Sequence, residues 1–407
     1  MAIDNKDKKV LKSSIEREQN EVACSAECEK IKGSKNLNVP HLRFPEFSGE
    51  WEMVSLQDIA TINPKSDPLQ NTFIYIDLEA VEKGELRKIQ EIMREEAPSR
   101  AQRVIDNNDI LFQCVRPYQK NNYIHRILNT SNQQWVASTG YAQIRTTELP
   151  NYIYHLLNTD EFNRKVMVRC TGSSYPAINS EDLATIHLYY TPDKKEQLKI
   201  SRLLDLLDKR IATQNKIIED LKKLKSAISE RLFKSVKGSI VLLSNICDIV
   251  KGKQINGENL SERGRYYVMN GGTEPSGYYD DYNVEANTIS ISEGGNSCGY
   301  VQFNTFPFWS GGHCYSIQNV TGNVDNLYLY HYLKSKEDAI MKLRIGSGLP
   351  NIQKKDLAIF KIKLPTFEQQ KIISTFLSSL ERKTQIEADI LIAMQSEKQH
   401  LLRQMFI

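Results

Sequence analysis

One short motif occurs twice in this chain, 174 residues apart. The stretch TGSSYPAINSEDLATI begins at Thr171, and IGSGLPNIQKKDLAIF begins at Ile345 (345 − 171 = 174). In both, Gly, Ser, Pro, Ile, Asp, Leu and Ala occur in the same order. Each stretch leads through a proline, Pro192 or Pro365, into a long run without another proline or glycine. Because these two residues are the main helix breakers, the repeat predicts two domains, each followed by a long helix.

The residue pattern on either side of the first helix predicts α+β domains. Short apolar runs such as FIYIDL, DILFQCV, NTISIS and YVQFNTF favour strands, and LPNYIYHLLNTDEFNRKVM has helical spacing. Repeats of this length duplicate a domain rather than build a solenoid. We therefore expect five segments: a polar, disordered tail (1–38), a first domain (39–190), a central long helix (191–237), a second domain (238–364) and a C-terminal long helix (365–407).

The two predicted helices carry heptad seams at a constant offset of 173 residues, counted from Pro192 and Pro365. Sustained spacing of this kind favours a coiled coil over two helices that each pack only on their own domain. A parallel pairing would set Lys225 beside Lys398, so we predict an antiparallel pair. The predicted interface residues are Leu207, Ile211, Gln214, Ile218, Leu221, Lys225, Leu232, Leu380, Glu387, Leu391, Met394, Lys398 and Leu401.

Three antiparallel registers one heptad apart place different residues opposite Lys225. It faces Leu380 in one register and Met394 in another. In the register between them, Lys225 faces Glu387 and Gln214 faces Lys398, so polar side chains meet polar side chains. Because buried polar residues fix the register of coiled coils, we predict this middle register, with Lys225 close to Glu387.

The composition places no strong limit on the partner. Lys plus Arg number 53 and Asp plus Glu 50, so the formal net charge is +3. Local basic patches matter more to nucleic-acid binding than this total. No apolar run approaches membrane-spanning length, and the N-terminus lacks the apolar core of a secretory signal. Seven scattered cysteines favour a reducing cytoplasm. The isolated pair Cys24 and Cys28 is not expected to bind a metal.

The signatures of common catalytic sites are absent from the sequence. It has no phosphate-binding GxxxxGK[ST] loop and no HExxH or HxE…CxxC zinc motif. SEGGNSCG could present backbone N–H groups to an anion, although a turn between strands is favoured. His313 and Cys314 are adjacent on a strand-like run, where neighbouring side chains point to opposite faces. We therefore expect a protein that recognises a partner and carries no catalytic residues or metal site.

Polar, basic and aromatic residues alternate in several loops, a pattern that suits DNA. Arginine matches the guanine edge, asparagine and glutamine match adenine, and lysine and tyrosine can hold phosphates. In the first domain the candidate DNA contacts are Gln113, Arg116, Tyr118, Lys120, Asn121, Ser138, Thr139, Ser173, Ser174 and Tyr175. In the second domain they are Asn270, Thr273, Asn296, Ser297, Trp309, His313 and Ser347.

Several strings resemble the specificity subunit of type I restriction–modification systems. VPHLRFPEFSGEW resembles the lead-in of that family, and APSRAQRVIDNNDILFQCVRPYQKN with STGYAQIR resembles one form of its target-recognition domain. GSSYPAINSEDL and GSGLPNIQKKDL resemble the stretches that close its two recognition domains. EQQKIISTFLSSLERK resembles the start of its helices. The resemblance extends from about residue 38 to the end, and residues 1–38 depart from the family pattern.

The resemblance implies a non-catalytic, cytoplasmic subunit that binds double-stranded DNA and no membrane. Each recognition domain would read one half of a bipartite target, and the helices would separate the halves. Two modification subunits, which bind S-adenosylmethionine and methylate adenine at N6, would dock on the helices. ATP-driven restriction subunits could join them. A stand-alone two-headed DNA-binding protein and a protein-interaction scaffold remain as alternatives. A complete single-chain restriction–modification enzyme is disfavoured, because it would need a methyltransferase domain with an Asn/Asp-Pro-Pro-aromatic motif and the sequence has none.

Overall fold

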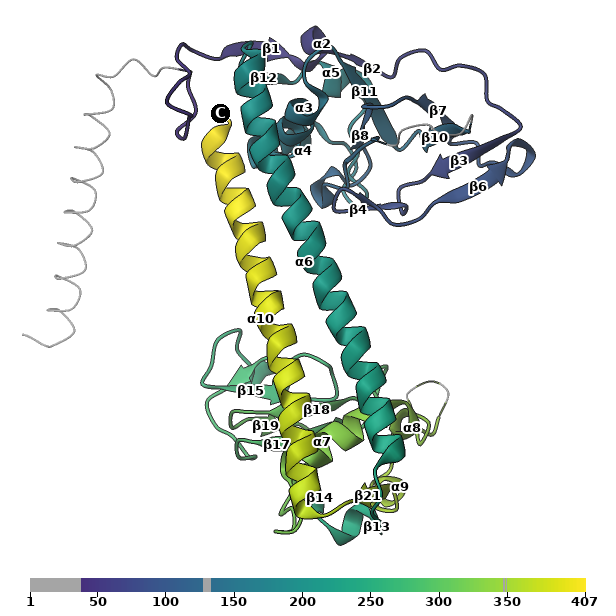
Figure 1. Cartoon of the computed structure of the whole chain (residues 1–407), viewed down its shortest axis with the longest axis vertical. Coiled ribbons are helices and arrows are strands. Elements are labelled where there is room, and N and C mark those ends of the chain that lie inside the picture. Colours follow the sequence, from purple (N-terminus) through teal and green to yellow (C-terminus); the bar gives the residue numbers. More distant parts are fainter. Residues whose placement is uncertain (1–37, 127–132, 347, 349) are drawn as a thin grey trace, which may run out of the picture. The chain divides into compact units, whose positions relative to one another are not determined.

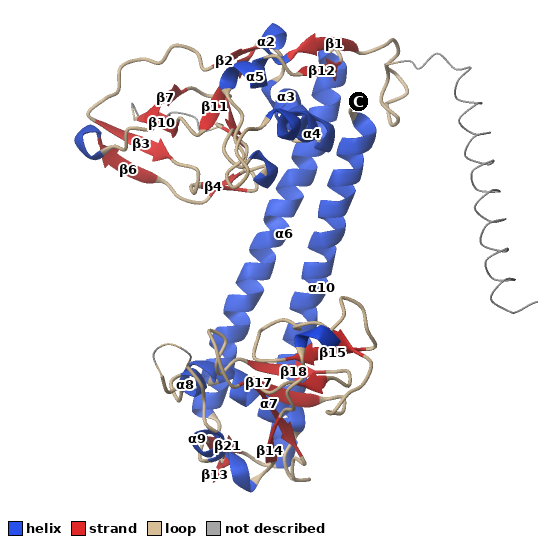
Figure 2. Ribbon diagram, turned by 180° about the vertical axis from the view of Figure 1, so that it is seen from behind, coloured by secondary structure: helices blue, strands red, loops and turns tan. Residues whose placement is uncertain are grey.

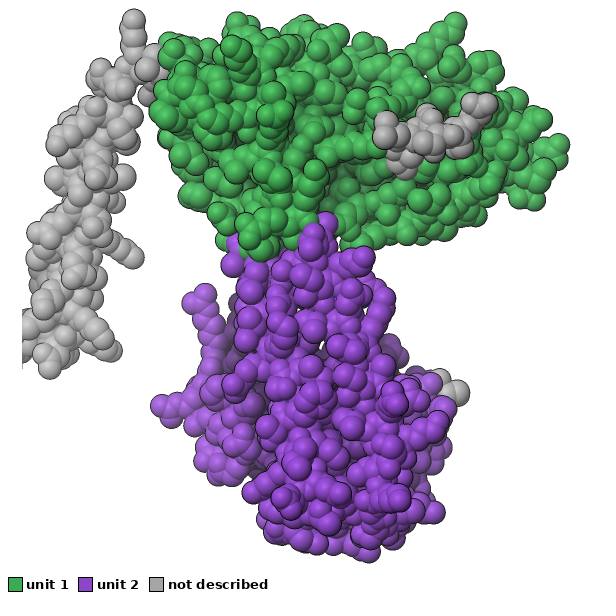
Figure 3. All heavy atoms as spheres, in the orientation of Figure 1, with its two compact units in different colours: residues 1–210, 394–407 green, residues 211–393 purple. Residues whose placement is uncertain are grey.

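The computed structural model describes residues 38–126, 133–346, 348 and 350–407, which form two compact units. The first unit consists of the described residues up to Arg210 together with Met394–Ile407. The second consists of those from Ile211 to Ala393. Figure 3 distinguishes the two units by colour. The tail predicted for residues 1–38 lies outside the described residues except for Asn38, and so does the Cys24/Cys28 pair.

Unit 1 contains the first domain of the chain, which is built on two four-stranded sheets (Figure 1). One sheet is antiparallel and has the order β2 (Ala60–Ile62), β11 (Tyr141–Thr146), β8 (Ile110–Gln113), β9 (Tyr123–Ile124). The other is mixed and has the order β6 (Gln90–Met93), β3 (Thr72–Ile76), β10 (Gln134–Ser138), β7 (Ala101–Ile105). Its β3 and β10 are parallel.

Short elements complete this domain. Two further strand pairs are β1 (Glu52–Ser55) with β12 (His187–Tyr190), and β4 (Val81–Glu82) with β5 (Glu85–Leu86). The helices are α2 (Leu56–Ile59), α3 (Pro150–Leu157), α4 (Asp160–Arg169) and α5 (Ser180–Ala184), with 3-10 turns η1 (Arg94–Glu96) and η2 (Pro117–Gln119). The single helical pattern seen in the sequence is thus two helices. Thr159 caps α4, because its side chain accepts a hydrogen bond from the Phe162 N–H.

The core of unit 1 combines residues from the start of the described range with residues at the C-terminal end of α10. Trp51 packs edge-on against Tyr152 and Phe406, with ring centroids 6.3 and 6.0 Å away. The guanidinium of Arg43 donates two hydrogen bonds, of 2.7 and 2.8 Å, to the fully buried carboxylate of Glu196. The lead-in segment that begins near residue 38 therefore holds the first domain against the start of one long helix and the end of the other.

Unit 2 repeats the plan with fewer strands (Figure 2, strands in red). Its main sheet is antiparallel and has the order β14 (Asp248–Lys251), β20 (Cys314–Gln318), β17 (Thr288–Ser292), β18 (Val301–Asn304). Further strands are β16 (Tyr278–Tyr279), β15 (Tyr266–Met269), β19 (Trp309–Ser310), β13 (Ser239–Leu242) and β21 (Lys361–Leu364). The short helices are α7 (Asn326–Ser335), α8 (Glu337–Met341) and α9 (Lys354–Ala358), with 3-10 turns η3 (Leu243–Asn245) and η4 (Gly257–Asn259).

Two long helices follow the domains, α6 (Lys194–Ser235) and α10 (Phe367–Met405), and each contributes to both units. They run antiparallel within each unit. In unit 1, Lys398 pairs with Asp208, while Leu402 and Met405 share a core with Ile200 and Leu204. No helix of the described ranges is both long and apolar enough to span a membrane.

In unit 2 the same antiparallel arrangement shows in two polar contacts between the helices. The Gln214 amide donates to Glu387 at 2.6 Å, and Lys225 donates to Glu381 at 2.7 Å. As the residue number rises along α6, its partner's number falls along α10.

The predicted register is wrong, although the antiparallel direction agrees. Lys225 meets Glu381 instead of Glu387, and Gln214 meets Glu387 instead of Lys398. The observed pairs lie near the rejected register in which Lys225 faces Leu380. The physical reason is the length of the lysine side chain, which reaches past the seam to a carboxylate beside it and keeps its charged end near water. All thirteen residues predicted for the interface are buried or half-buried.

A candidate nucleic-acid interface

The repeated motif forms the same backbone junction in both domains. In the first, the Arg116 N–H donates to the Pro176 carbonyl at 2.8 Å, and the Ile178 N–H donates to the Cys114 carbonyl at 3.1 Å. The motif therefore turns back and pairs with the residues that follow β8. This junction fixes the loop of residues 171–177 beside the turn that begins at Arg116.

The second domain makes the matching contacts. The Gly295 N–H donates to the Pro350 carbonyl at 3.1 Å, and the Ile352 N–H donates to the Glu293 carbonyl at 2.8 Å. Here the motif pairs with the residues that follow β17. The correspondence makes Gly295 the counterpart of Arg116. The motif is thus repeated because each domain closes the same joint.

Arg116 adopts a backbone conformation that normally favours glycine. Its φ is +55°, in the left-handed region, and Lys120 at the other end of the same turn has φ +53°. The corresponding turn in the second domain has Gly295 and Gly299, with φ +75° and +93°. A left-handed conformation costs a residue with a Cβ about 1–2 kcal/mol. Such strain at an exposed loop is a sign of function in the side chain.

The side chain of Arg116 is available to a ligand. Its guanidinium lies over the Tyr175 ring, 4.4 Å from the centroid. Within the described ranges it makes neither an ion pair nor a hydrogen bond. Tyr175 is 64% exposed and Tyr118 is 50% exposed, and both Ser173 and Ser174 are exposed. These five residues form a surface with one stacked cation, two aromatic rings and two hydroxyl groups, which we call the Arg116 surface.

Three other candidate DNA contacts of the first domain have partners within the protein. Gln113 is 2% exposed, and its amide bonds to the Gln119 side chain and to the Asn121 N–H. The Asn121 side chain accepts a hydrogen bond from the Lys83 N–H at 3.0 Å. Lys120 forms an ion pair with Asp160 at 2.6 Å. Their side chains shape the turn, and their role as DNA contacts stays a prediction.

Ser138 and Thr139 lie in the turn between β10 and β11. The buried Ser138 hydroxyl accepts a hydrogen bond from the Gly140 N–H at 3.2 Å, so this serine is also occupied. Thr139 is half-buried, and its N–H donates to the Arg100 carbonyl at 2.9 Å. The turn supports the neighbouring Cys114, whose N–H donates to the Gly140 carbonyl.

Glycine-rich loops gather at the matching end of the second domain. Thr273, Asn296 and His313 are exposed there, and Ser297 is half-buried. Two other predicted contacts have structural partners. The Asn270 side chain accepts a hydrogen bond from the His313 N–H at 3.1 Å.

Trp309, another predicted DNA contact, also has a partner within the protein. Its indole N–H donates to the Lys253 carbonyl at 2.9 Å. Ser347 lies outside the described residues.

A family model matches most of the chain in two segments. Its description is "Type I restriction modification DNA specificity domain", and it covers residues 48–223 and 239–395. The chain belongs to this family. Each matched segment contains one domain and a large part of the helix that follows it.

Individual relatives match shorter parts of the chain. A Mycoplasma pneumoniae protein named as a type I specificity subunit is 33% identical over 138 residues, which span 33% of this chain and 36% of that protein. A Mycoplasma genitalium protein that is also named as a type I specificity subunit is 30% identical over 156 residues, which span 37% of this chain and 39% of that protein. The matches thus span less than half the length of these two relatives.

Solved structures show the same fold over a longer range. A crystal structure of a type I restriction–modification S subunit from M. genitalium aligns with a TM-score of 0.63 and 17% identity, covering 91% of this chain and 99% of that one. A chain from a study of the assembly and conformational transition of the type I system aligns with a TM-score of 0.56 and 21% identity, covering 89% of this chain and 98% of that one.

One residue of this specificity-family chain escaped the sequence analysis. Arg103 on β7 is half-buried, and no carboxylate within the described ranges lies at ion-pair distance from it. Its Nε is buried without a hydrogen-bond partner there, and desolvation lowers its pKa. The buried Nε–H of Arg103 is therefore a donor without an acceptor among the described residues. An arginine in a strand gives no sequence signal that separates this state from an ordinary surface position.

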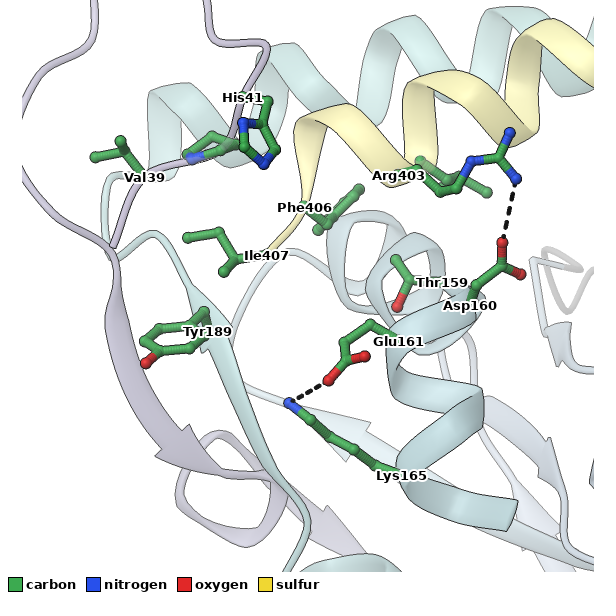
Figure 4. Close-up of a pocket in the computed structure, with 12 residues that line it drawn as sticks. Val39, His41, Thr159, Asp160, Glu161, Lys165, Tyr189, Arg403, Phe406 and Ile407 are labelled. Carbon is green, nitrogen blue, oxygen red and sulfur yellow. Dashed lines mark ion pairs between the residues drawn. The ribbon is translucent and has the colours of Figure 1, made fainter. Parts of the chain in front are cut away.

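A second surface feature of unit 1 is a hollow of about 400 Å³ between the lead-in segment and the end of α10. Figure 4 shows its residues, and dashed lines mark two ion pairs, Arg403 with Asp160 and Lys165 with Glu161. Both carboxylates are therefore already neutralised by bases from the same unit. The hollow presents no free acid–base pair.

The structure shows the surroundings of the reactive side chains that the sequence singled out. No group of three or more metal-ligating side chains occurs in those ranges. Burial raises the pKa of the Cys114 and Cys314 thiols to about 11, so neither is a ready thiolate nucleophile. His313 is exposed while Cys314 is buried, so the adjacent residues do not form a nucleophile–base pair. The exposed polar loops suit recognition.

Proposed function

We propose that this chain is the DNA-recognition subunit of a type I restriction–modification complex. Each of its two domains reads one half of a bipartite target in double-stranded DNA, and the helices set the spacer between the halves. The observation that carries the proposal is the duplicated joint. Both domains match the DNA specificity model and close with the same backbone contacts, yet they present different side chains next to that joint.

The proposed partners supply the chemistry. Two modification subunits dock on the helices, hold S-adenosylmethionine and methylate adenine at N6, and ATP-driven restriction subunits join them in the cytoplasm. The specificity chain binds neither cofactor. Its contribution is positional, because a base must be flipped out of the duplex for methylation and the flipping pocket belongs to the methyltransferase.

Domain exchange tests this function. Residues 239–364 are replaced by the matching domain of a relative, the variant is expressed with its modification subunits, and the methylated motif is determined by sequencing host DNA. We expect one half of the motif to change and the other half and the spacer to remain. An exchange that alters both halves, or that leaves the motif intact, contradicts independent reading by the two domains.

A change in helix length provides a second test of the same function. Four extra residues in both α6 and α10 lengthen each helix by about 6 Å, at 1.5 Å per residue. We expect a longer spacer with both half-motifs unchanged. A specificity subunit whose motif keeps its spacer after this insertion would not use the helices as the ruler.

A further inference from the structure

The two oxygens of the Glu293 carboxylate differ in their hydrogen-bond partners. Glu293 follows β17, and its side chain is 8% exposed. One oxygen, Oε1, accepts hydrogen bonds from the Lys251 ammonium at 2.7 Å and from the Tyr315 hydroxyl at 2.9 Å. The other, Oε2, is buried and has no hydrogen-bond partner among the described residues. A buried acceptor without a donor loses its hydration with no compensation, and the loss is greater for a charged group.

His313 stands directly beside this unused oxygen. Its Nδ1 lies 3.8 Å from Glu293 Oε2, just beyond hydrogen-bond distance, while its side chain is 65% exposed. The Asn270 side chain accepts a hydrogen bond from the His313 N–H and so fixes the backbone. A modest rotation of the imidazole brings Nδ1–H onto Oε2. The opposite nitrogen, Nε2, is the one that remains free for a ligand.

Glycines keep the space beside this histidine clear. A Cβ added to Gly271, which has φ +85°, would lie 3.1 Å from His313 Cβ. A Cβ added to Gly294 would lie 3.9 Å from His313 Nδ1. The end of β17, the loop after β15 and the loop before β20 therefore approach one another at glycine residues, which have no side chains. A surface of this kind lets a bulky partner come close to the imidazole.

The charges around the pair favour an anionic or electron-rich partner. Lys251 on β14 already neutralises Glu293. A doubly protonated His313 therefore leaves the group with one net positive charge. Cys298, Cys314 and Tyr315 also interact with Glu293. The carboxylate-bearing Glu274 follows Gly271 and Gly272 on the loop after β15, and its backbone oxygen would lie 3.1 Å from a Cβ on Gly272.

We propose that Glu293 and His313 form a DNA-contacting pair in the second domain, in which Glu293 Oε2 accepts Nδ1–H of His313 and Nε2–H donates to a hydrogen-bond acceptor on DNA. The acceptor is N7 of a guanine or a phosphate oxygen. His313 is the contacting residue, and Glu293 is a positioning residue. The inference rests on the proposed function and assigns the second domain a contact of its own.

The arrangement predicts that DNA binding takes up a proton. Because both ring nitrogens donate in the complex, the imidazole must be in its charged form there. Affinity for the second half-site should therefore fall as pH rises from 6 to 9. Glu293→Gln changes this in a specific way, because an amide N–H facing Nδ1 holds a neutral ring that still carries its proton on Nε2. We expect that variant to keep binding and to lose the pH dependence.

The experiment uses the full chain with its modification subunits and a duplex that contains the motif found by sequencing host DNA. Affinity is measured by fluorescence anisotropy between pH 6 and 9 for the natural protein, His313→Asn, Glu293→Gln and the control His187→Asn. His187 is an exposed histidine of the first domain. We expect a roughly 10–100-fold loss for His313→Asn if the contact is to guanine, corresponding to a base contact of about 1–3 kcal/mol. The control should remain at the natural affinity.

Two duplexes distinguish the sources of the acceptor. Replacing guanines of the second half-site by 7-deazaguanine should remove the effect of His313→Asn if the contact is to N7. Replacing single phosphates by methylphosphonate should remove it if the contact is to the backbone, and the salt slope should then fall by about 1.

The result that overturns the pair is His313→Asn with the natural affinity, motif and pH dependence. A natural complex that binds no motif-containing DNA would instead refute the proposed function.

Discussion

The two recognition domains share a backbone joint and differ in what they place on it. In the first, the left-handed position at the start of the turn is Arg116, stacked on Tyr175. In the second, the same position is Gly295, around which a Cβ would find nothing within 4 Å. The first domain accepts backbone strain to keep a side chain there, and the second presents Asn296 and His313 from neighbouring loops. The repeated backbone is thus a frame, and recognition resides in substitutable side chains.

A second contrast lies where each domain rests on its long helix. Both domains bury a histidine at the same place in the repeat, His155 on α3 and His331 on α7. His155 bonds to the Asp205 carboxylate at 2.9 Å, whereas His331 bonds to the Ser378 hydroxyl at 2.9 Å. Asp205 and Ser378 are 173 residues apart (378 − 205 = 173), the offset of the two helices. One domain rests on a charge-assisted contact and the other on a neutral contact.

The largest effect is expected when the pH is lowered, because protonation of His331 should destabilise the second domain. Burial lowers the pKa of His331 to about 4 from 6.5. Between these values the unfolded chain binds a proton that the folded domain does not, so the free energy of unfolding decreases as pH falls. The loss approaches about 3 kcal/mol below pH 4. We expect His331→Gln to abolish it, as checked by hydrogen exchange of α7 at pH 7 and pH 5 after correction for the intrinsic rate.

His155→Gln is the matched variant for that measurement. The Asp205 pKa is lowered by its hydrogen bond with His155 even though burial opposes this. Removing the histidine should therefore weaken protection of α3 already at pH 7, by about 1.5–3 kcal/mol for a bond to a charged group. Equal acid sensitivity of α7 in the natural chain and in His331→Gln would show that protonation of His331 does not cause the loss of stability.

Substitution at Arg116 tests the first contrast. We expect Arg116→Gly to weaken binding of the first half-site by about 1–3 kcal/mol, the value of a good base contact. The same change should stabilise the folded domain by about 1 kcal/mol, because glycine adopts the left-handed conformation freely. Anisotropy with half-site duplexes measures the first effect and thermal unfolding the second. Gly295→Arg, the reverse change in the second domain, should lower stability. Normal DNA binding by Arg116→Gly would show that this arginine does not contact DNA and has only a structural role.

The smallest effect is expected in the helix pair. Lys225→Glu should destabilise unit 2 by about 1 kcal/mol, because it sets two carboxylates together at a partly exposed site. Adding Glu381→Lys should restore most of that loss. The combination of Lys225→Glu with Glu387→Lys is the matched control and should restore less. Denaturant unfolding of the four proteins checks this, and a better rescue by position 387 would return the originally predicted register.

Much of the fold was available from the sequence because its signals are local. Proline and glycine bound the long helices, and the offset between Pro192 and Pro365 identified the repeat. The break between α3 and α4 was missed, although Thr159 followed by two acidic residues is a capping signal. The register was missed for a longer-range reason. Seam positions alone cannot show that Lys225 reaches a carboxylate one residue beyond Leu380.

The candidate site was only partly predictable for a related reason. Gln113 and Asn121 have the residue types that read adenine, yet Gln113 bonds to groups of its own turn and the Asn121 side chain accepts a hydrogen bond from the Lys83 N–H. Arg116 and His313 look no different from them in the printed sequence. Which polar side chains remain free depends on how neighbouring loops fold back. That is decided by contacts between residues far apart in the chain, such as Arg116 with Pro176.

The contact between Gln214 and Glu387 has an evolutionary consequence. The two positions are 173 residues apart (387 − 214 = 173) and so are the same position of the repeat, meeting itself. In a homodimer of two identical half-length ancestors, whatever residue stood there would face its own copy. Two glutamates would repel, and two glutamines would forgo the charge-assisted bond. One Gln and one Glu make a better contact than either like-with-like pair, and only a chain that carries both copies of the repeat can provide it.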